Sequence, residues 1–139
     1  MARLNKKMTG SIRTIASGKL KWKEAIPGAD GTVLVGDPDR HGAEYVVRYR
    51  LQAGFQVPPH YHPNDEHITV ISGKLLFGSG RKFELGKTRL LRPGDYAFVP
   101  GRAPHFTSTK ETTVVQAHGR GPFKIIYLNS TPARSRRKM

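Results

Sequence analysis

The chain of 139 residues contains no cysteine, and this absence excludes disulfide bonds, zinc–thiolate sites and cysteine nucleophiles. It also has no apolar stretch as long as a membrane span, so we expect no transmembrane segment. The N-terminus, residues 1–8, has basic residues but no apolar run behind them, which is unlike a secretory signal. On this pattern we expect a cytoplasmic protein.

Acidic residues are missing from both ends of the chain. Residues 1–23 carry seven Lys and Arg and no acid, and the tail 134–139 adds four more basic residues. Residues 24–133 have thirteen Lys and Arg against ten Asp and Glu, so most of the net charge of +14 belongs to the ends. Basic arms can bind nucleic acid or an anionic membrane surface through counterion release. Because no aromatic platform or recognition helix accompanies the charge, solvated tails are the simpler interpretation.

Helical periodicity is almost absent, and short β-rich segments recur between turn residues instead. We expect strands at 32–35, 45–51, 66–71, 75–77, 83–85, 88–91, 96–99, 105–108, 112–117 and 123–128. Pro58 and Pro59 mark the entry of a further strand and are not expected in a central ladder. Many short strands at even spacing predict an all-β antiparallel sandwich or barrel over 24–133. Residues 1–23 then form a basic arm or edge strand, and 134–139 a basic tail.

Four residues carry the expected chemistry: His60, His62, Glu66 and His105. Three imidazoles and one carboxylate form a ligand set that suits a divalent transition metal. Since side chains two apart share one face of a strand, His60 and His62 project together. Glu66 opens the next strand, where Ile68 and Val70 share its face. A carboxylate in such apolar surroundings is costly alone but favourable beside a cation.

The same alternation predicts on which face of a strand the other notable side chains lie. His67 is expected on the face opposite Glu66, as a packed or surface residue. His118 shares a face with Gln116, and the pattern leaves open whether it lines the pocket wall or lies in a rim loop. The remaining expectations are His41 on a surface loop, Tyr45, Val47, Tyr49 and Leu51 inside the barrel, and Phe98 and Phe106 in the core or pocket wall.

Two motifs in residues 54–109 closely resemble those of the cupin superfamily. The first is Gly54, five residues, His60-X-His62, three residues, Glu66, six residues, Gly73; the second is Gly94, five residues, Pro100, then His105. Two positions depart from the pattern: the glycine usual two residues after the proline is Arg102, and the closing Asn is Thr109. The resemblance implies a small single-domain jelly-roll barrel, a double-stranded β-helix, with one divalent metal held by the four side chains. It also implies frequent homodimerisation.

Three functional hypotheses follow. The first is a small metalloenzyme, of dioxygenase or isomerase type, whose metal (Fe, Mn, Ni, Zn or Cu) binds a small oxygen-rich or anionic ligand. The second is a metal-dependent module that binds or senses such a ligand without turnover. The third is nucleic-acid binding through the basic ends. The catalytic residues, the substrate and the metal identity are not specified by the sequence.

Overall fold

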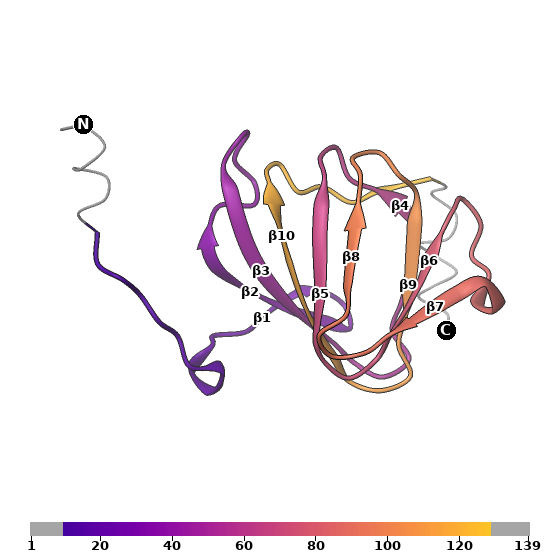
Figure 1. Cartoon of the computed structure of the whole chain (residues 1–139), viewed down its shortest axis with the longest axis horizontal. Helices are drawn as coiled ribbons and strands as arrows, with labels where there is room; N and C mark the ends of the chain where they lie inside the picture. Colours follow the sequence, from indigo (N-terminus) through magenta and orange to yellow (C-terminus); the bar gives the residue numbers. More distant parts are fainter. Residues whose placement is uncertain (1–9, 129–139) are drawn as a thin grey trace.

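A computed structural model of the chain describes residues 10–128. The described residues form two antiparallel sheets that face each other as a jelly-roll barrel, which confirms the expected fold class (Figure 1). The six-stranded sheet has the order β1 (Lys23–Ile26), β2 (Ala29–Gly36), β3 (Glu44–Leu51), β10 (Thr113–Arg120), β5 (Glu66–Ser72) and β8 (Tyr96–Val99). The five-stranded sheet has the order β11 (Ile126–Tyr127), β4 (Gln56–Tyr61), β9 (His105–Ser108), β6 (Leu75–Ser79) and β7 (Thr88–Leu91). Two 3-10 turns, Ser17–Lys19 and Leu85–Lys87, are the helical elements of this part of the chain.

Side-chain alternation determines which face of each strand is buried. On β5, Glu66, Ile68 and Val70 are buried, whereas the residues between them are more exposed. On β3, Tyr45, Val47 and Leu51 are buried, as the sequence predicts. The inward faces of both sheets therefore supply the core, and Glu66 enters the barrel on the same stripe as its apolar neighbours.

The two departures from the cupin motifs each have a local structural consequence. Arg102 has a φ of 69°, the one positive φ of a non-glycine residue within 10–128, and its N–H donates to the His62 carbonyl at 2.8 Å. Thr109 is buried; its hydroxyl accepts from the Phe55 N–H at 3.1 Å and donates to the Gln52 carbonyl at 2.7 Å. Arg102 thus occupies a conformation that favours glycine, while Thr109 joins β9 to the loop before β4.

Some expected elements were wrong. Residues 83–85 form no strand, because the chain turns there into Leu85–Lys87. Pro58 and Pro59 lie inside β4, which has neighbours on both sides; the ladder to β9 passes from Val57 to His60 and skips both prolines. An irregular register therefore accommodates two residues that cannot donate a ladder hydrogen bond.

The terminal regions are only partly described. Residues 10–22 form an extended arm with no strand, and the first edge strand begins at Lys23 (Figure 1). Residues 1–9 and the tail 134–139 lie outside the described residues, so the division into arm, barrel and tail stays a prediction. Neither short helix in the described part of the chain has the length to cross a membrane.

Candidate metal centre

Three strands bring the four predicted ligands together inside the barrel. His60 lies on β4, directly opposite His105 on β9, and His62 follows the end of β4. Glu66 begins β5 in the facing sheet. All four are buried, with exposed fractions between 3% and 5%. Polar side chains at this depth need compensating partners.

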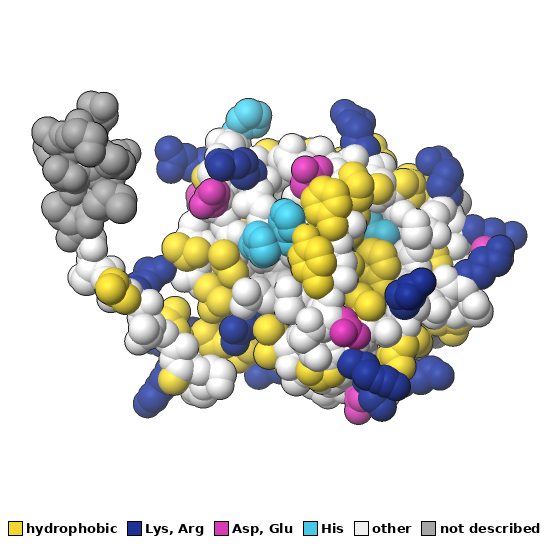
Figure 2. Space-filling view, in the orientation of Figure 1, with side chains coloured by type: hydrophobic (Ala, Val, Ile, Leu, Met, Phe, Trp, Pro, Cys, Tyr) yellow, Lys and Arg dark blue, Asp and Glu magenta, His cyan; other side chains and the backbone are white. Residues whose placement is uncertain are grey.

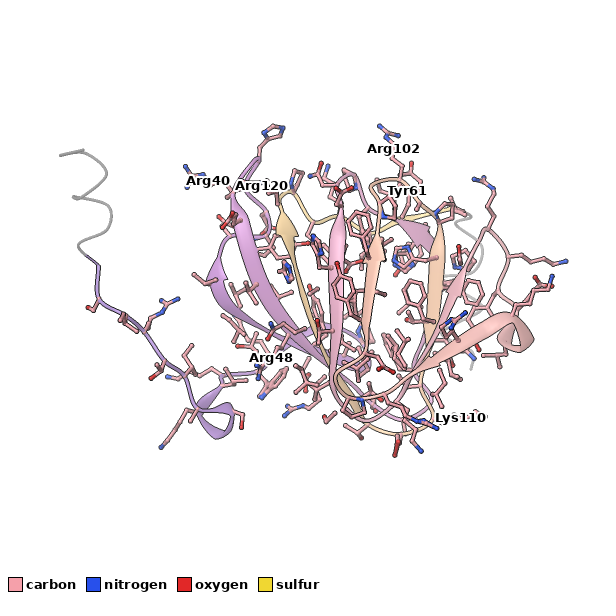
Figure 3. All side chains as sticks on the ribbon, in the orientation of Figure 1. Arg40, Arg48, Tyr61, Arg102, Lys110 and Arg120 are labelled. Carbon is pink, nitrogen blue, oxygen red and sulfur yellow. The ribbon has the colours of Figure 1, made fainter. Side chains whose placement is uncertain are left out.

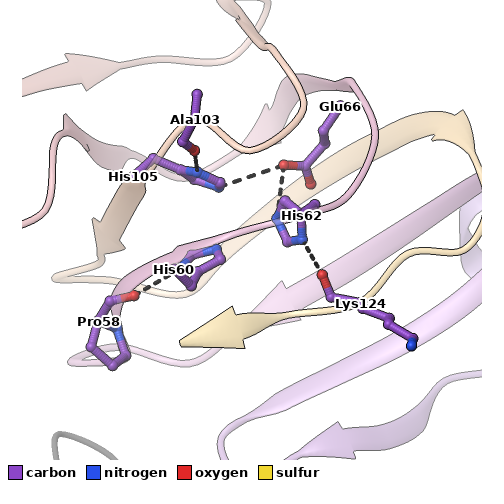
Figure 4. A network of polar contacts seen from close by, with 7 residues as sticks. All are labelled: Pro58, His60, His62, Glu66, Ala103, His105 and Lys124. Carbon is purple, nitrogen blue, oxygen red and sulfur yellow. Dashed lines mark hydrogen bonds and ion pairs between the residues drawn. The ribbon is translucent and has the colours of Figure 1, made fainter. Parts of the chain in front are cut away.

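The side chains converge on one point (Figure 4). His60, His62 and His105 each offer a ring nitrogen, and these three atoms lie within 4.8 Å of one another. The Oε1 atom of Glu66 lies 3.2 Å from His62 Nε2 and 3.6 Å from His105 Nε2. The three imidazole nitrogens could hold a metal ion, and the adjacent carboxylate oxygen is a further donor of a kind that transition metals bind.

Backbone carbonyls fix the tautomer of all three imidazoles. The Nδ1 atoms of His60, His62 and His105 lie 2.7, 2.7 and 3.0 Å from the carbonyl oxygens of Pro58, Lys124 and Ala103. A carbonyl only accepts, so each Nδ1 carries the hydrogen and donates it. In the neutral rings, Nε2 therefore carries a lone pair. Anchoring of the distal nitrogen in this way is how metal-binding imidazoles are held.

The carboxylate of Glu66 lacks a hydrogen-bond partner at its inner oxygen. Its Oε1 atom is buried and accepts no well-formed hydrogen bond from residues 10–128. The nearest polar atoms are Nε2 of His62 and of His105, which hold lone pairs when the rings are neutral. Lone pairs facing a carboxylate oxygen repel it unless a proton or cation lies between them. The residues present therefore fit a bound metal ion.

At both histidines beside Glu66, burial lowers the pKa and the charge of Glu66 raises it. Burial lowers the pKa of His62, but the contact with Glu66 and the Lys124 carbonyl outweigh burial, so the net pKa is raised. At His105 burial dominates, and its pKa is lowered despite the attraction of Glu66 and the Ala103 carbonyl. A neutral His105 keeps its Nε2 lone pair available to a metal.

A cavity of about 360 Å³ opens onto the four residues. Tyr49 lines it, so the phenol that the sequence placed inside the barrel lies at the site. Burial, followed by the charge of Glu66, raises the pKa of Tyr49 to about 12. Phe123 and Ile125 complete one wall, and the ring of Phe123 stacks on His62 at 4.5 Å.

Two sequence expectations near the site were wrong. Phe98 is 50% exposed on the outer face of β8 instead of lying in the core, whereas Phe106 is buried as predicted. His118 lies on β10 and faces outward, beside His67 on β5, with the two rings stacked at 4.4 Å. His118 is thus neither pocket wall nor rim loop, and burial together with His67 lowers its pKa. The expectation for His67 holds: it faces away from Glu66 and its Nδ1 lies 2.6 Å from the Tyr96 hydroxyl.

Sequence reasoning missed the segment 123–125 as part of the site. Phe123 packs against His62, and Lys124 holds the same histidine through its carbonyl. The available signal was alternation: Phe123 and Ile125 are partly buried and line the cavity, while Lys124 between them is exposed. A backbone carbonyl leaves no side-chain signal, so its role was not readable from the sequence.

Comparison with known proteins identifies the class. The sequence profile of the cupin domain matches residues 47–117, which include the four predicted ligands, and the chain therefore belongs to the cupin family. A search of curated proteins finds no match.

Solved structures show the same fold at low sequence identity. The polyketide cyclase RemF from Streptomyces resistomycificus has a TM-score of 0.68 at 20% identity, over 93% of this chain and 94% of that one. KdgF from Halomonas sp. has a TM-score of 0.60 at 21% identity, over 76% and 93%. A salicylate 1,2-dioxygenase variant from Pseudoaminobacter salicylatoxidans in complex with gentisate has a TM-score of 0.58 at 19% identity, over 81% and 28%. At this level of identity the likeness is one of fold.

Proposed function

We propose that the protein is a metal-dependent enzyme of dioxygenase or isomerase type that acts on a small oxygen-donor ligand. It would hold one divalent metal through His60, His62, His105 and Glu66. The observation that carries the proposal is a set of three converging imidazoles, each held by a carbonyl at Nδ1, beside a buried carboxylate oxygen that lies close to two of them and accepts no hydrogen bond from residues 10–128. Three nitrogens and one oxygen suit Fe, Mn, Ni, Zn or Cu.

When bound, such a metal supplies Lewis acidity that polarises a ligand oxygen. The residues of the chain position the donor atoms, surround the ligand and supply a hydrogen-bond donor. His60 and His105 lie on paired neighbouring strands of one sheet, so their donor atoms are positioned by the fold before the ligand arrives. The largely apolar cavity walls would cover much of a bound ligand and reduce its contact with water. Tyr49 lines the cavity, and its hydroxyl, which is neutral at neutral pH, can donate to a ligand oxygen.

Elemental analysis of the purified protein tests the metal assignment. We expect about one metal ion per wild-type chain, and strong loss of metal in His105→Ala, because one of the converging nitrogens is removed. The matched control is His118→Ala, which removes an imidazole from the outer face of the barrel. Unchanged metal content in His105→Ala would contradict the four-ligand assignment.

The second candidate is a metal-dependent module that binds a ligand without turnover. The same cavity supports it, because binding requires only the metal and the walls. The two candidates differ in one measurement: a binding module is stabilised by its ligand with no product formed, whereas an enzyme converts the ligand. Several proteins of this fold are named as enzymes, including the cyclase and the dioxygenase above, which favours the first candidate.

Nucleic-acid binding through the basic ends stays a separate, weaker proposal. Residues 1–9 and 134–139 lie outside the described residues, and on the face in Figure 2 the Lys and Arg side chains are spread around the rim. The test is salt-sensitive binding that is lost when residues 1–10 and 134–139 are deleted. Binding that survives the deletion would rule out the basic ends as its source.

A further inference from the structure

The walls of the cavity restrict the chemistry of its ligand. Eighteen residues line the cavity, and apart from the three histidines, Glu66, Tyr49 and Thr107 all of them are apolar. No Lys or Arg is among these lining residues. The basic side chains labelled in Figure 3, such as Arg48, Arg102 and Lys110, lie around the outside of the barrel. Among residues 10–128 the cavity is thus lined without a Lys or Arg, although the whole chain has a net charge of +14.

The charge of the loaded site sets a limit on the charge of the ligand. A divalent ion, three neutral imidazoles and the Glu66 carboxylate sum to a net charge of about +1. A neutral ligand or a monoanion leaves the site with a charge of about +1 or 0. A dicarboxylate or a phosphate ester would add two or more negative charges to a largely apolar cavity in which the described lining has no Lys or Arg to pair with them.

The walls favour a ligand with a flat apolar body. Phe55 and Phe123 line the cavity, and Phe123 stacks near-parallel to both His62 and Tyr49, with interplanar angles of 22° and 26°. This row of rings runs from a metal-ligand side chain out along the cavity wall. A cavity of roughly 150 Å³ holds benzene, so about 360 Å³ accommodates a molecule of one or two rings.

Two hydroxyl groups give the cavity its polar contacts. Tyr49 and Thr107 both line it, and among residues 10–128 neither side-chain hydroxyl has a hydrogen-bond partner. A phenol is ordinarily neutral at neutral pH, so the Tyr49 hydroxyl can donate a hydrogen bond. Hydroxyls without partners beside a metal site are suited to an oxygen of a metal-chelating ligand.

We infer that the cavity takes a flat aromatic ligand that is neutral or carries one negative charge and presents two neighbouring oxygens to the metal. Hydroxy-ketones, phenols and related chelators belong to this class, whereas sugar acids, dicarboxylates and phosphate esters do not. The inference rests on the proposed metal site and narrows the small oxygen-rich or anionic ligand expected from the sequence.

Three probes test the inference on the zinc-loaded full chain by calorimetry. Benzohydroxamate and acetohydroxamate share one monoanionic chelating group and differ in the aromatic ring; oxalate is a chelating dianion with no apolar body. After correction for the affinity of each probe for free zinc, we expect benzohydroxamate to bind tenfold or more tightly than acetohydroxamate. Oxalate should bind more weakly than either. The visible spectrum of the cobalt-loaded protein shows whether each probe reaches the metal.

Variants of the lining residues test whether the preference for an aromatic ligand arises in the cavity. Phe55→Ala should weaken benzohydroxamate while leaving acetohydroxamate nearly unchanged, and Tyr49→Phe should weaken both by about three- to tenfold. Thr107→Val is a second hydroxyl variant that preserves volume. The control is Phe98→Ala, whose side chain is on the outer face and should leave all affinities unchanged.

The outcomes distinguish a failure of the proposed ligand class from a failure of the proposed metal site. Equal corrected affinities of the two hydroxamates, or tighter binding of oxalate, would overturn the ligand class while the metal site stands. A ring preference that Phe55→Ala does not reduce would also overturn it. A wild-type chain that holds no zinc would overturn both the proposed function and the inference.

Discussion

Glu66 is the residue whose environment most directly indicates a missing partner. Its buried Oε1 faces Nε2 of His62 and His105 and accepts no hydrogen bond from the described residues. An unpaired buried acceptor costs about 1–3 kcal/mol, and more when it is charged. The carboxylate therefore destabilises the metal-free fold when the histidines are neutral, and a metal ion reverses that effect.

Glu66→Gln should accordingly change the stability of the metal-free and the metal-bound protein in opposite directions. Without metal, at about pH 9 where imidazoles are neutral, the variant should be as stable as wild type or up to about 1 kcal/mol more stable, because the amide can donate to an Nε2 lone pair. With metal present, its stabilisation should fall well below that of wild type. Urea unfolding with and without a chelator measures both values. A variant that loses stability equally in both forms would show that Glu66 has a structural role only.

Arg102 carries local backbone strain at the position that is usually glycine in the cupin motif described above. Its φ of 69° is unfavourable for a side chain with a Cβ atom, and its exposed side chain makes no contact that requires this conformation. We expect Arg102→Gly to raise the free energy of unfolding by about 1 kcal/mol. Arg102→Ala, which keeps the Cβ, should gain little and serves as the control. A larger gain from alanine than from glycine would rule out backbone strain as the cause.

At the scale of the elements, β6 and β9 pack through one close contact behind His105. Gly78 on β6 pairs with Phe106 on β9, and a Cβ added at Gly78 would overlap the Phe106 ring. Phe106 is fully buried and neighbours the predicted ligand His105. We expect Gly78→Ala to destabilise the fold by about 1–3 kcal/mol.

A second substitution distinguishes overpacking from a backbone effect at Gly78. If the ring is the cause, Phe106→Leu should cost less in the Gly78→Ala background than in wild type, which urea unfolding of the four proteins measures. Gly86→Ala is the control, because a Cβ there meets nothing within 4 Å and its φ is ordinary. Additive effects of the two substitutions would contradict the packing explanation.

The strands were predictable wherever alternation and turn residues agreed. Residues 45–51 and 66–71 largely follow a two-residue period, and both strands form with the expected faces inward. β4 was harder, because Pro58 and Pro59 argue against an interior strand and only the skipped register with β9 accommodates them. Phe98 was misplaced because hydrophobicity does not say which face of an antiparallel sheet meets solvent.

The residues proposed as metal ligands could be predicted from the sequence, but the cavity around them could not. The spacing of His60, His62 and Glu66 indicated a common face, and the cupin resemblance brought in His105. The carbonyls that fix the tautomers are backbone atoms, and sequence does not place them. The absence of Lys and Arg from the walls also depends on folding, since basic residues occur throughout the sequence.

At the scale of the whole molecule, the outer face of the six-stranded sheet carries a cluster of exposed aromatic side chains. Tyr96 and Phe98 are 53% and 50% exposed on β8, and both rings lie near His67, which stacks on His118. Figure 2 shows hydrophobic side chains next to histidine side chains on this face. Ile71 continues the patch along β5. Adjacent aromatic side chains of this kind usually mark a protein contact. We propose that this face pairs with a second copy of the chain, which is the homodimer expected from the cupin resemblance.

Phe98→Glu should then convert the dimer into a monomer, because a dimer interface would bury the new charge without a partner. Sedimentation equilibrium measures the change, and we expect the apparent mass to fall from twice the 15.5 kDa of one chain to a single copy. The control is Leu90→Glu, a similarly exposed apolar residue on β7 of the other sheet, which should leave the dimer intact. Metal content should be the same in all three proteins, since Phe98 faces away from the cavity. A wild-type monomer, or a dimer that dissociates only in Leu90→Glu, would place the contact elsewhere or remove it.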